Sequence, residues 1–240
     1  MFNKNNFFYN FLLDKKKFKR NLKKTKNVFN SLLNDFESDE FPLFDSFKKD
    51  YEFDFSNLLI KKFRKQKNVI VIGIGGSILG TKAIFSFLEK KIKKKFFFFD
   101  NLDHNLNKNY KEIKNIKNSC FVVVSKSGNT IETIANLSVI FKKKLLKNKL
   151  VIITEIADNA LISIANKYRA EIIEHKEFIG GRYSVLSEAG MFPVALMGLN
   201  LLKFRNFEAL IKNKNFVSTL IQNVASIYTL VSKKINNSVI

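Results

Sequence analysis

Three hydroxyl side chains and one glycine occupy six consecutive positions, in the sequence Ser-Lys-Ser-Gly-Asn-Thr at residues 125–130. An apolar run precedes this segment, and a stretch with helical character follows it. Thr130 or Asn129 can cap that helix, whereas Ser125, Ser127 and Thr130 together can point at one oxyanion. A cap needs only one of these groups. The segment therefore predicts a phosphate cradle at a helix N-terminus, with capping alone as the alternative.

A glycine-rich turn comes earlier in the chain, in the sequence Gly-Ile-Gly-Gly-Ser-Ile-Leu-Gly at residues 73–80. Glycines let the backbone turn sharply and approach a ligand closely, and Ser77 adds a hydroxyl. The helix that follows offers free N–H groups and the positive end of its dipole to an anion. Ile78 stands where a dinucleotide fingerprint needs its third glycine, and no Walker phosphate loop is present. The alternative is a tight strand-to-helix turn without a ligand.

An arginine follows two glycines in the segment Gly180–Gly190, whose sequence is Gly-Gly-Arg-Tyr-Ser-Val-Leu-Ser-Glu-Ala-Gly. The glycines free the backbone just before Arg182. A guanidinium presented in this way can bind an anionic group or stabilise a developing enolate. The alternative is that Arg182 pairs with a structural carboxylate.

The predicted chemistry does not involve a metal. No group of His, Cys, Asp and Glu has the spacing of a metal site, and the chain has only 2 histidines, His104 and His175. Each of them is more typical of a surface or core position than of a catalyst. The single cysteine, Cys120, permits no intrachain disulfide, which fits a reducing cytoplasm.

Short apolar runs must position these segments. The runs cover residues 69–72, 96–99, 121–124, 151–153 and 171–173. Near-continuous apolar runs indicate strands buried on both faces, and the intervening segments are long enough for crossover helices. We therefore expect an α/β fold, a three-layer α/β/α sandwich around a parallel, flavodoxin-like or Rossmann-like sheet. Ligands bind such sheets at the carboxyl ends of the strands, so the hydroxyl segment and the glycine turn should converge there.

Helical segments flank the expected sheet. Apolar residues from Phe18 to Leu33 recur at helical spacing, which predicts a basic amphipathic helix, and Pro42 marks a turn after it. Residues 187–202 and 207–234 also look helical. Pro193 should kink or reset the first of these two segments.

The net charge of the 240-residue chain is +21, from 42 Lys and Arg against 21 Asp and Glu. Such a charge invites a nucleic-acid interpretation. The favoured residues Lys, Asn, Ile and Phe all have A/T-rich codons, however, and lysine runs at 15–17, 90–95 and 142–144 lie beside different elements. We therefore attribute the charge mainly to compositional drift and expect no nucleic-acid partner, with a functional polyanion surface as the alternative. Long-range steering of small anionic substrates should follow from the charge.

No membrane association is expected from the sequence. Residues 1–13 contain a short apolar cluster that is too short and too polar for a signal peptide. No run of about 18 apolar residues, the length needed to cross a bilayer, is present.

The three segments together resemble the glucose-6-phosphate isomerase family, whose sugar-isomerase (SIS) domains bind phosphosugars. The family's first glycine turn resembles residues 73–80, its phosphate loop resembles Ser125–Thr133, and its Gly-Gly-Arg-(Tyr/Phe)-Ser block resembles Gly180–Ser184. The Asn-Leu-Asp step at residues 101–103 fits as well. Order and spacing agree over residues 68–200.

The resemblance implies a role for each matched residue. Ser125, the backbone of Lys126, Ser127 and Thr130 would hold the sugar phosphate. Gly76 and Ser77 would line the sugar pocket, and Arg182 would stabilise an enediolate. The reaction implied interconverts glucose 6-phosphate and fructose 6-phosphate in glycolysis and gluconeogenesis, through a cis-enediol, with no cofactor or metal. The resemblance also implies a cytoplasmic homodimer.

The family's catalytic glutamate, ring-opening histidine and late lysine belong to blocks that we do not find before Ile240. Glu132 and Glu188 lie in or beside the motifs, but neither occupies the position of the family's base. We therefore expect a fragment, the amino-terminal portion of a longer enzyme, which is poorly active alone. Its expected parts are a helical segment (1–65), a first SIS domain (66–185), and a helical connection leading to a second SIS domain (186–240).

Two other functions remain open. One is a non-catalytic phosphosugar-binding regulator, in which the basic first 65 residues would bind DNA, although no clear helix-turn-helix is found there. The other is the sugar-isomerase part of an amidotransferase that makes amino-sugar phosphates.

Overall fold

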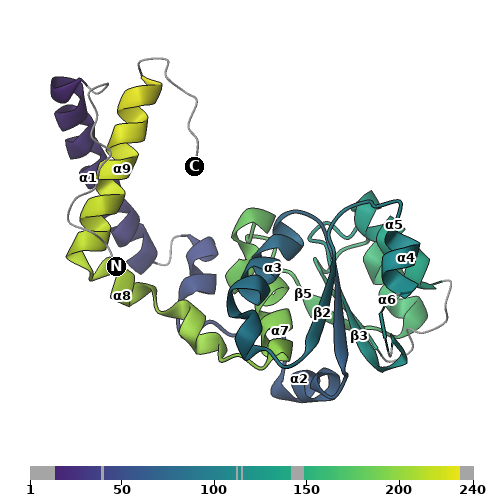
Figure 1. Cartoon of the computed structure of the whole chain (residues 1–240). Coiled ribbons are helices and arrows are strands. Elements are labelled where there is room, and N and C mark those ends of the chain that lie inside the picture. The colour runs from purple at the N-terminus through teal and green to yellow at the C-terminus, as the bar shows by residue number, and fades with distance from the viewer. Residues whose placement is uncertain (1–13, 39–40, 112, 115, 142–148, 233–240) are drawn as a thin grey trace. The chain divides into compact units, whose positions relative to one another are not determined.

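A computed structural model describes residues 14–38, 41–111, 113–114, 116–141 and 149–232 of the chain (Figure 1). The chain forms two compact units, of which one comprises Ser46–Arg205 and the other Met1–Asp45 with Asn206–Ile240. The expected division at residues 65 and 185 stays a prediction. The expectations for residues 1–13 and 142–144, and those for 207–234 and 186–240 as far as they cover residues 233–240, lie outside the described residues.

The larger unit contains a five-stranded sheet in which every pairing is parallel. Its strands are β1 (Asn68–Ile72), β2 (Lys95–Phe99), β3 (Ser119–Val124), β4 (Leu150–Thr154) and β5 (Glu171–Glu174). The order β2-β1-β3-β4-β5 is that of flavodoxin-like sheets and confirms the expected fold class. The carboxyl ends of β1 and β3 are adjacent at the point where the order reverses.

Helices cover both faces of this sheet (Figure 1). The helices of the unit are α2 (Asn57–Arg64), α3 (Gly76–Leu88), α4 (Leu106–Lys111), α5 (Ile131–Phe141), α6 (Ala160–Tyr168) and α7 (Glu188–Met197). Residues of α4, α5 and α6, including Tyr110, Leu137 and Leu161, form one buried cluster with the strands. On the opposite face, Phe85 of α3 packs against Phe96 and Phe98 of β2.

The central strands are apolar because both of their faces are covered. Every residue of β1, β3 and β4 is buried. The edge strand β2 is less enclosed, since Phe96 and Phe99 are buried but Phe97 and Phe98 are only half-buried. The burial of the phenylalanine run in the sheet is thus partial.

The smaller unit contains the long helices α1 (Lys15–Glu37) and α9 (Lys214–Val231). The short helix α8 (Phe207–Ile211) directly precedes α9. Asp14 caps α1 by accepting hydrogen bonds from two backbone N–H groups. The two long helices run antiparallel, because Asn21 donates to Thr229 Oγ1 at 2.9 Å and Lys17 Nζ reaches Ser232 O. The predicted amphipathic helix is therefore present.

The expectation of a helix reset at Pro193 needs correction. The helix α7 continues through Pro193 without a reset and ends at Gly198 in the left-handed conformation. All ten residues of α7 are buried, so tertiary packing outweighs the hydrogen bond that proline cannot donate. The segment expected to be helical over 207–234 contains α8 and α9. Pro42 does begin a turn, a 3-10 helix over Pro42–Phe47.

Candidate phosphosugar site

The glycine turn after β1 is held between the ends of the two neighbouring strands. Gly73 N–H donates to Phe99 O of β2 at 3.2 Å. A Cβ atom at Gly73 would lie only 2.9 Å from Val124 O, at the end of β3. Glycine is therefore required for the turn to approach β3 this closely. The contact places the turn beside Ser125, which directly follows β3.

The Gly-Gly-Arg block lies against the same turn from the other side. A Cβ atom at Gly76 would lie 2.2 Å from Gly181 O and 2.9 Å from Arg182 N, so the two backbones are in direct contact. The single hydroxyl proton of Ser184 is shared between Gly181 O, 2.8 Å from Oγ, and Gly76 O, 3.3 Å from Oγ. Three segments that are far apart in the sequence thus meet at the carboxyl edge of the sheet.

The hydroxyl segment forms a compact loop at the N-terminus of α5. Gly128 has a φ of +66°, a conformation that favours glycine, and its N–H donates to Ser125 O. Ser125 Oγ and Thr130 Oγ1 are 2.8 Å apart. Their mutual hydrogen bond uses one of the two hydroxyl protons, so the other proton can be donated to an anion.

The loop is anchored to the segment after β4. Asn129 Oδ1 accepts a hydrogen bond from Ala160 N at 2.9 Å, at the start of α6. Lys126 O accepts from Glu155 N at 3.0 Å and from the Thr154 hydroxyl at 3.2 Å. Asn129 therefore connects the loop to the start of α6. The sequence had indicated only a possible capping role for this residue. These contacts fix the loop before any ligand arrives.

Backbone donors in this loop are free for a ligand. Across the described part of the chain, the N–H groups of Lys126, Ser127 and Thr130 have no acceptor. They precede the first turn of α5, where the helix dipole favours negative charge. Ser127 Oγ accepts from Asn129 N, which leaves the hydroxyl proton of Ser127 available. The arrangement is suited to an oxyanion such as a phosphate.

The side chain of Lys126 does not point its charge at these donors. Lys126 Nζ donates to Glu177 O at 2.5 Å and lies 3.4 Å from Glu155 Oε1. Its ammonium charge is therefore paired with the Glu155 carboxylate, in the segment after β4. This geometry agrees with a role for Lys126 through its backbone.

Arg182 is exposed and lies in the 3-10 helix Gly181–Leu186. Among the described residues its guanidinium has no carboxylate or hydrogen-bond partner, so the structural ion pair considered above is not formed there. Five donors of a permanent cation are thus available for an anionic group. Gly76 holds the backbone of Arg182, not its side chain.

A buried polar cluster supports this segment, and no sequence pattern indicated it. Tyr51 Oη donates to the fully buried carboxylate of Glu188 at 2.9 Å, and Asp54 N donates to it at 3.2 Å. Arg205 is also buried and donates to Leu186 O at 2.6 Å and to Ser46 O at 3.1 Å. Arg205 thereby fixes the end of the 3-10 helix that carries Arg182.

Burial dominates the titration of this cluster. It raises the pKa of Glu188, although the hydrogen bonds from Tyr51 and Asp54 oppose the shift. Burial and the nearby Glu188 carboxylate together raise the pKa of Tyr51. Because these partners enclose Glu188, this carboxylate of the Gly180–Gly190 segment supports the fold and does not face a ligand.

The two histidines occupy different environments. His104 is exposed, whereas His175 is buried and its Nδ1 lies 3.2 Å from Lys176 O. Burial, with the charge of Lys126, lowers the pKa of His175. No group of three or more potential metal ligands occurs in the part of the chain that the structure describes.

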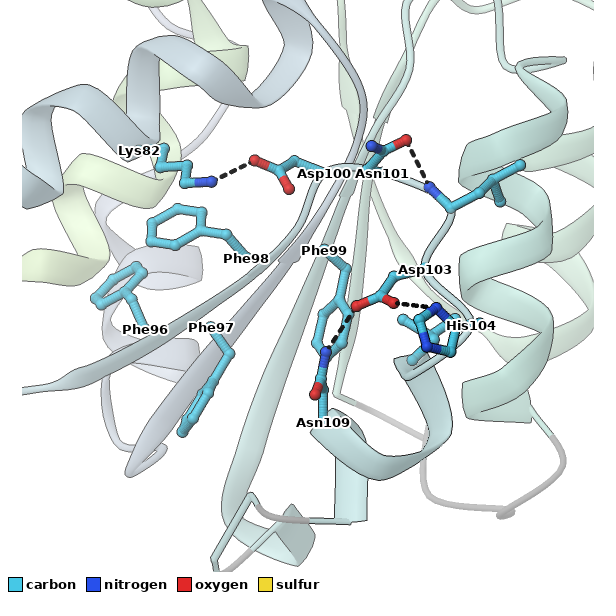
Figure 2. A pocket seen from close by; sticks show the side chains of 12 residues that line it. Lys82, Phe96, Phe97, Phe98, Phe99, Asp100, Asn101, Asp103, His104 and Asn109 are labelled. Carbon is cyan, nitrogen blue, oxygen red and sulfur yellow. Dashed lines mark hydrogen bonds and ion pairs between the residues drawn. The ribbon is translucent and has the colours of Figure 1, made fainter.

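A separate pocket of about 630 Å³ lies beside the end of β2 and includes the Asn-Leu-Asp step at residues 101–103 (Figure 2). Its wall is the phenylalanine run of β2, and its rim carries the ion pair between Lys82 and Asp100 at 2.5 Å. Asp103 accepts hydrogen bonds from Asn105 N and from Asn109. This step therefore shapes the loop between β2 and α4, and the pocket does not include the hydroxyl loop.

A family model described as phosphoglucose isomerase matches residues 56–239, more than three quarters of the chain. The chain belongs to the phosphoglucose isomerase family. A glucose-6-phosphate isomerase of Borreliella afzelii (strain PKo) is 37% identical over 145 residues, which are 55% of this chain and 27% of that protein. A glucose-6-phosphate isomerase of Mesomycoplasma hyopneumoniae (strain 232) is 33% identical over 175 residues, 68% of this chain and 41% of that protein. The chain thus covers less than half the length of these relatives.

Two solved structures resemble this chain, one in sequence and fold and the other in fold alone. A glucose-6-phosphate isomerase from Chlamydia trachomatis D/UW-3/Cx matches with a TM-score of 0.54 and 26% identity, over 72% of this chain and 34% of that one. A hypothetical protein of Thermus thermophilus shares the fold, with a TM-score of 0.63 and 19% identity over 92% of this chain and 57% of that one. The three segments that meet at the sheet edge all lie within the matched family region. No helix within the described ranges has the length and hydropathy needed to span a bilayer.

Proposed function

We propose that this chain supplies the phosphosugar-binding sheet of a glucose-6-phosphate isomerase, which interconverts glucose 6-phosphate and fructose 6-phosphate. The observation that carries the proposal is the convergence of a loop with free donors, a glycine turn and an arginine block at one sheet edge. Family membership supports the substrate class. The chemistry needs no external oxidant or reductant, because aldose and ketose are isomers and one carbon is oxidised while its neighbour is reduced.

The phosphate of the sugar binds in the loop between β3 and α5. The N–H groups of Lys126, Ser127 and Thr130 donate to its oxygens, together with the hydroxyl protons that Ser125, Ser127 and Thr130 leave free. The sugar itself extends toward Gly76 and Ser77. The close approach of Gly181 to Gly76 defines that end of the proposed site.

Arg182 acts on charge that develops during the reaction. Moving a proton between C2 and C1 produces a cis-enediolate, whose oxygens carry negative charge in the transition state. An unpaired guanidinium stabilises this charge more strongly than it stabilises the neutral sugar, which is the condition for catalysis. The carboxylate that moves the proton is not among the proposed residues. Glu188 is not proposed for this role, because it is enclosed by Tyr51 and Asp54.

We also propose the assembly and compartment that the family implies, a homodimer in the cytoplasm. The buried free thiol of Cys120 is compatible with a reducing compartment.

A binding experiment with two ligands tests the role of Arg182. The ligands are glucose 6-phosphate and a phosphorylated aldonohydroxamate, whose charged planar group resembles the enediolate. The chain should bind the hydroxamate more tightly, and Arg182→Ala should remove at least about tenfold of that preference while changing glucose 6-phosphate affinity less than about threefold. Arg182→Lys should retain part of the preference. Equal losses for both ligands would contradict a role in charge stabilisation.

A further inference from the structure

The N-terminal half of α1 carries a dense group of cations. Eight of the twelve residues from Lys15 to Lys26 are Lys or Arg, and no Asp or Glu occurs from Lys15 to Asn34. Seven of the eight are exposed, and they are Lys15, Lys16, Lys19, Arg20, Lys23, Lys24 and Lys26. We call these seven residues the α1 cation face.

The cation face occupies one side of the helix. At about 100° per residue, the seven side chains spread over roughly 180° of the circumference and about 16 Å of helix length. The other side faces α9, where Asn21 bonds to Thr229 and Leu22 lines a groove with Val217 and Ile221. Six of the seven cations therefore project away from α9 as one surface, and Lys26 lies at its edge, where it lines the same groove.

The positive charge of the cation face is not balanced by neighbouring carboxylates of the described residues. Within the described residues, none of the seven cations forms an ion pair. Pairs such as Lys15–Lys19 and Lys19–Lys23 are like charges four residues apart, which destabilise a helix. The cations also lie toward the N-terminus, where the helix dipole is positive and disfavours them. A bound polyanion relieves both penalties.

Compositional drift, to which we attribute most of the net charge, does not account for the cation face, so here we take up the alternative of a functional polyanion surface. Drift in codon usage raises lysine on every solvated surface, and α9 is exposed in the same unit. Yet α9 has one basic residue, Lys214, in its 18 residues. It exposes Leu220, Val224 and Ile227 instead. The lysine excess is concentrated on one helix of the pair, as expected of a binding surface.

We propose that the α1 cation face binds the phosphate backbone of nucleic acid without sequence preference. A lipid surface is less suitable, because helices that lie on membranes insert an apolar face, and that side of α1 contacts α9. The cation face contains no aromatic residue that could stack on a base. Contacts are therefore confined to phosphates. This binding is independent of the proposed isomerase chemistry.

The test measures binding of the chain to a fluorescent duplex of about 20 base pairs across a salt series. Lys16, Lys19 and Lys23 are replaced together by Gln, which removes three charges and keeps a good helix former. The matched control replaces Lys90, Lys91 and Lys93 by Gln, three exposed lysines of the other unit that also lack ion-pair partners among the described residues.

The plot of log K against log salt should lose up to about 2.7 units of slope in the α1 variant, because each phosphate contact contributes about 0.9. The control should change the slope by less than about one unit, and Ser125→Ala should leave it unchanged. Equal losses in both triple variants would show that net charge alone attracts the duplex and would overturn the proposal. Absence of duplex binding at low salt, with or without binding to phosphatidylserine vesicles, would overturn it as well.

Discussion

Replacing Gly76 by alanine tests the contact that joins the glycine turn to the arginine block. The added Cβ would lie 2.2 Å from Gly181 O and 2.9 Å from Arg182 N, closer than the 3.0 Å below which such contacts essentially do not occur. Both neighbours are backbone atoms, so the two segments must separate. Overpacking of this kind destabilises by about 1–3 kcal/mol. Loss of the Ser184 hydrogen bond to Gly76 O adds about 1 kcal/mol.

The expected loss in the free energy of unfolding is therefore about 2–4 kcal/mol, or roughly 4–16 °C in Tm for a chain of this size. Urea denaturation followed by circular dichroism measures it. The matched control is Gly181→Ala, on the other side of the same contact, where an added Cβ meets nothing within 4 Å. The control should stay within about 0.5 kcal/mol of the wild type. A Gly76→Ala variant as stable as the control would refute the close contact.

Three further measurements probe Glu188, Gly128 and Cys120. Burial raises the pKa of Glu188, so the stability that its protonated form provides is lost as pH rises from the ordinary pKa of 4.5 through the raised pKa of the folded chain. Denaturation at a series of pH values should therefore show the stability of the wild type, relative to Glu188→Gln, falling over that window and then staying constant. Gly128→Ala should lower the free energy of unfolding by about 1–3 kcal/mol in urea denaturation and weaken glucose 6-phosphate binding, because φ is +66° and the new Cβ would lie 2.1 Å from Asn159 Oδ1. Unchanged binding would contradict a role for this loop in holding the ligand. Burial raises the pKa of the Cys120 thiol, so mass spectrometry should detect iodoacetamide labelling only after unfolding, and rapid labelling of the native chain would contradict that burial.

The sheet was predictable because buried strands impose a strong local pattern. Each apolar run, such as residues 121–124, lies inside one observed strand. The sequence left flavodoxin-like and Rossmann-like sheets open, since strand order depends on crossovers that no short segment encodes. The continuation of α7 through Pro193 was also beyond local reasoning. It depends on burial of the whole helix, which arises only in the folded chain.

The sequence predicted which segments form the candidate site, but not the buried polar cluster that holds one of them in place. Ser125 and Thr130 are five positions apart on one loop, so their proximity follows from local spacing. The cluster of Tyr51, Glu188 and Arg205 joins residues more than a hundred positions apart. No sequence pattern marks such a cluster, because packing of distant elements brings it together. The roles proposed for the site residues remain predictions for binding experiments.

The most direct measurement is calorimetric titration of the chain with glucose 6-phosphate, with glucose as the control ligand. We predict binding of the phosphorylated sugar alone. We also predict at least about a tenfold loss of affinity in the double variant Ser125→Ala with Thr130→Ala, because hydrogen bonds to a charged group contribute about 1.5–3 kcal/mol. Equal binding of glucose and glucose 6-phosphate, or full affinity in the double variant, would contradict a phosphate site at the N-terminus of α5.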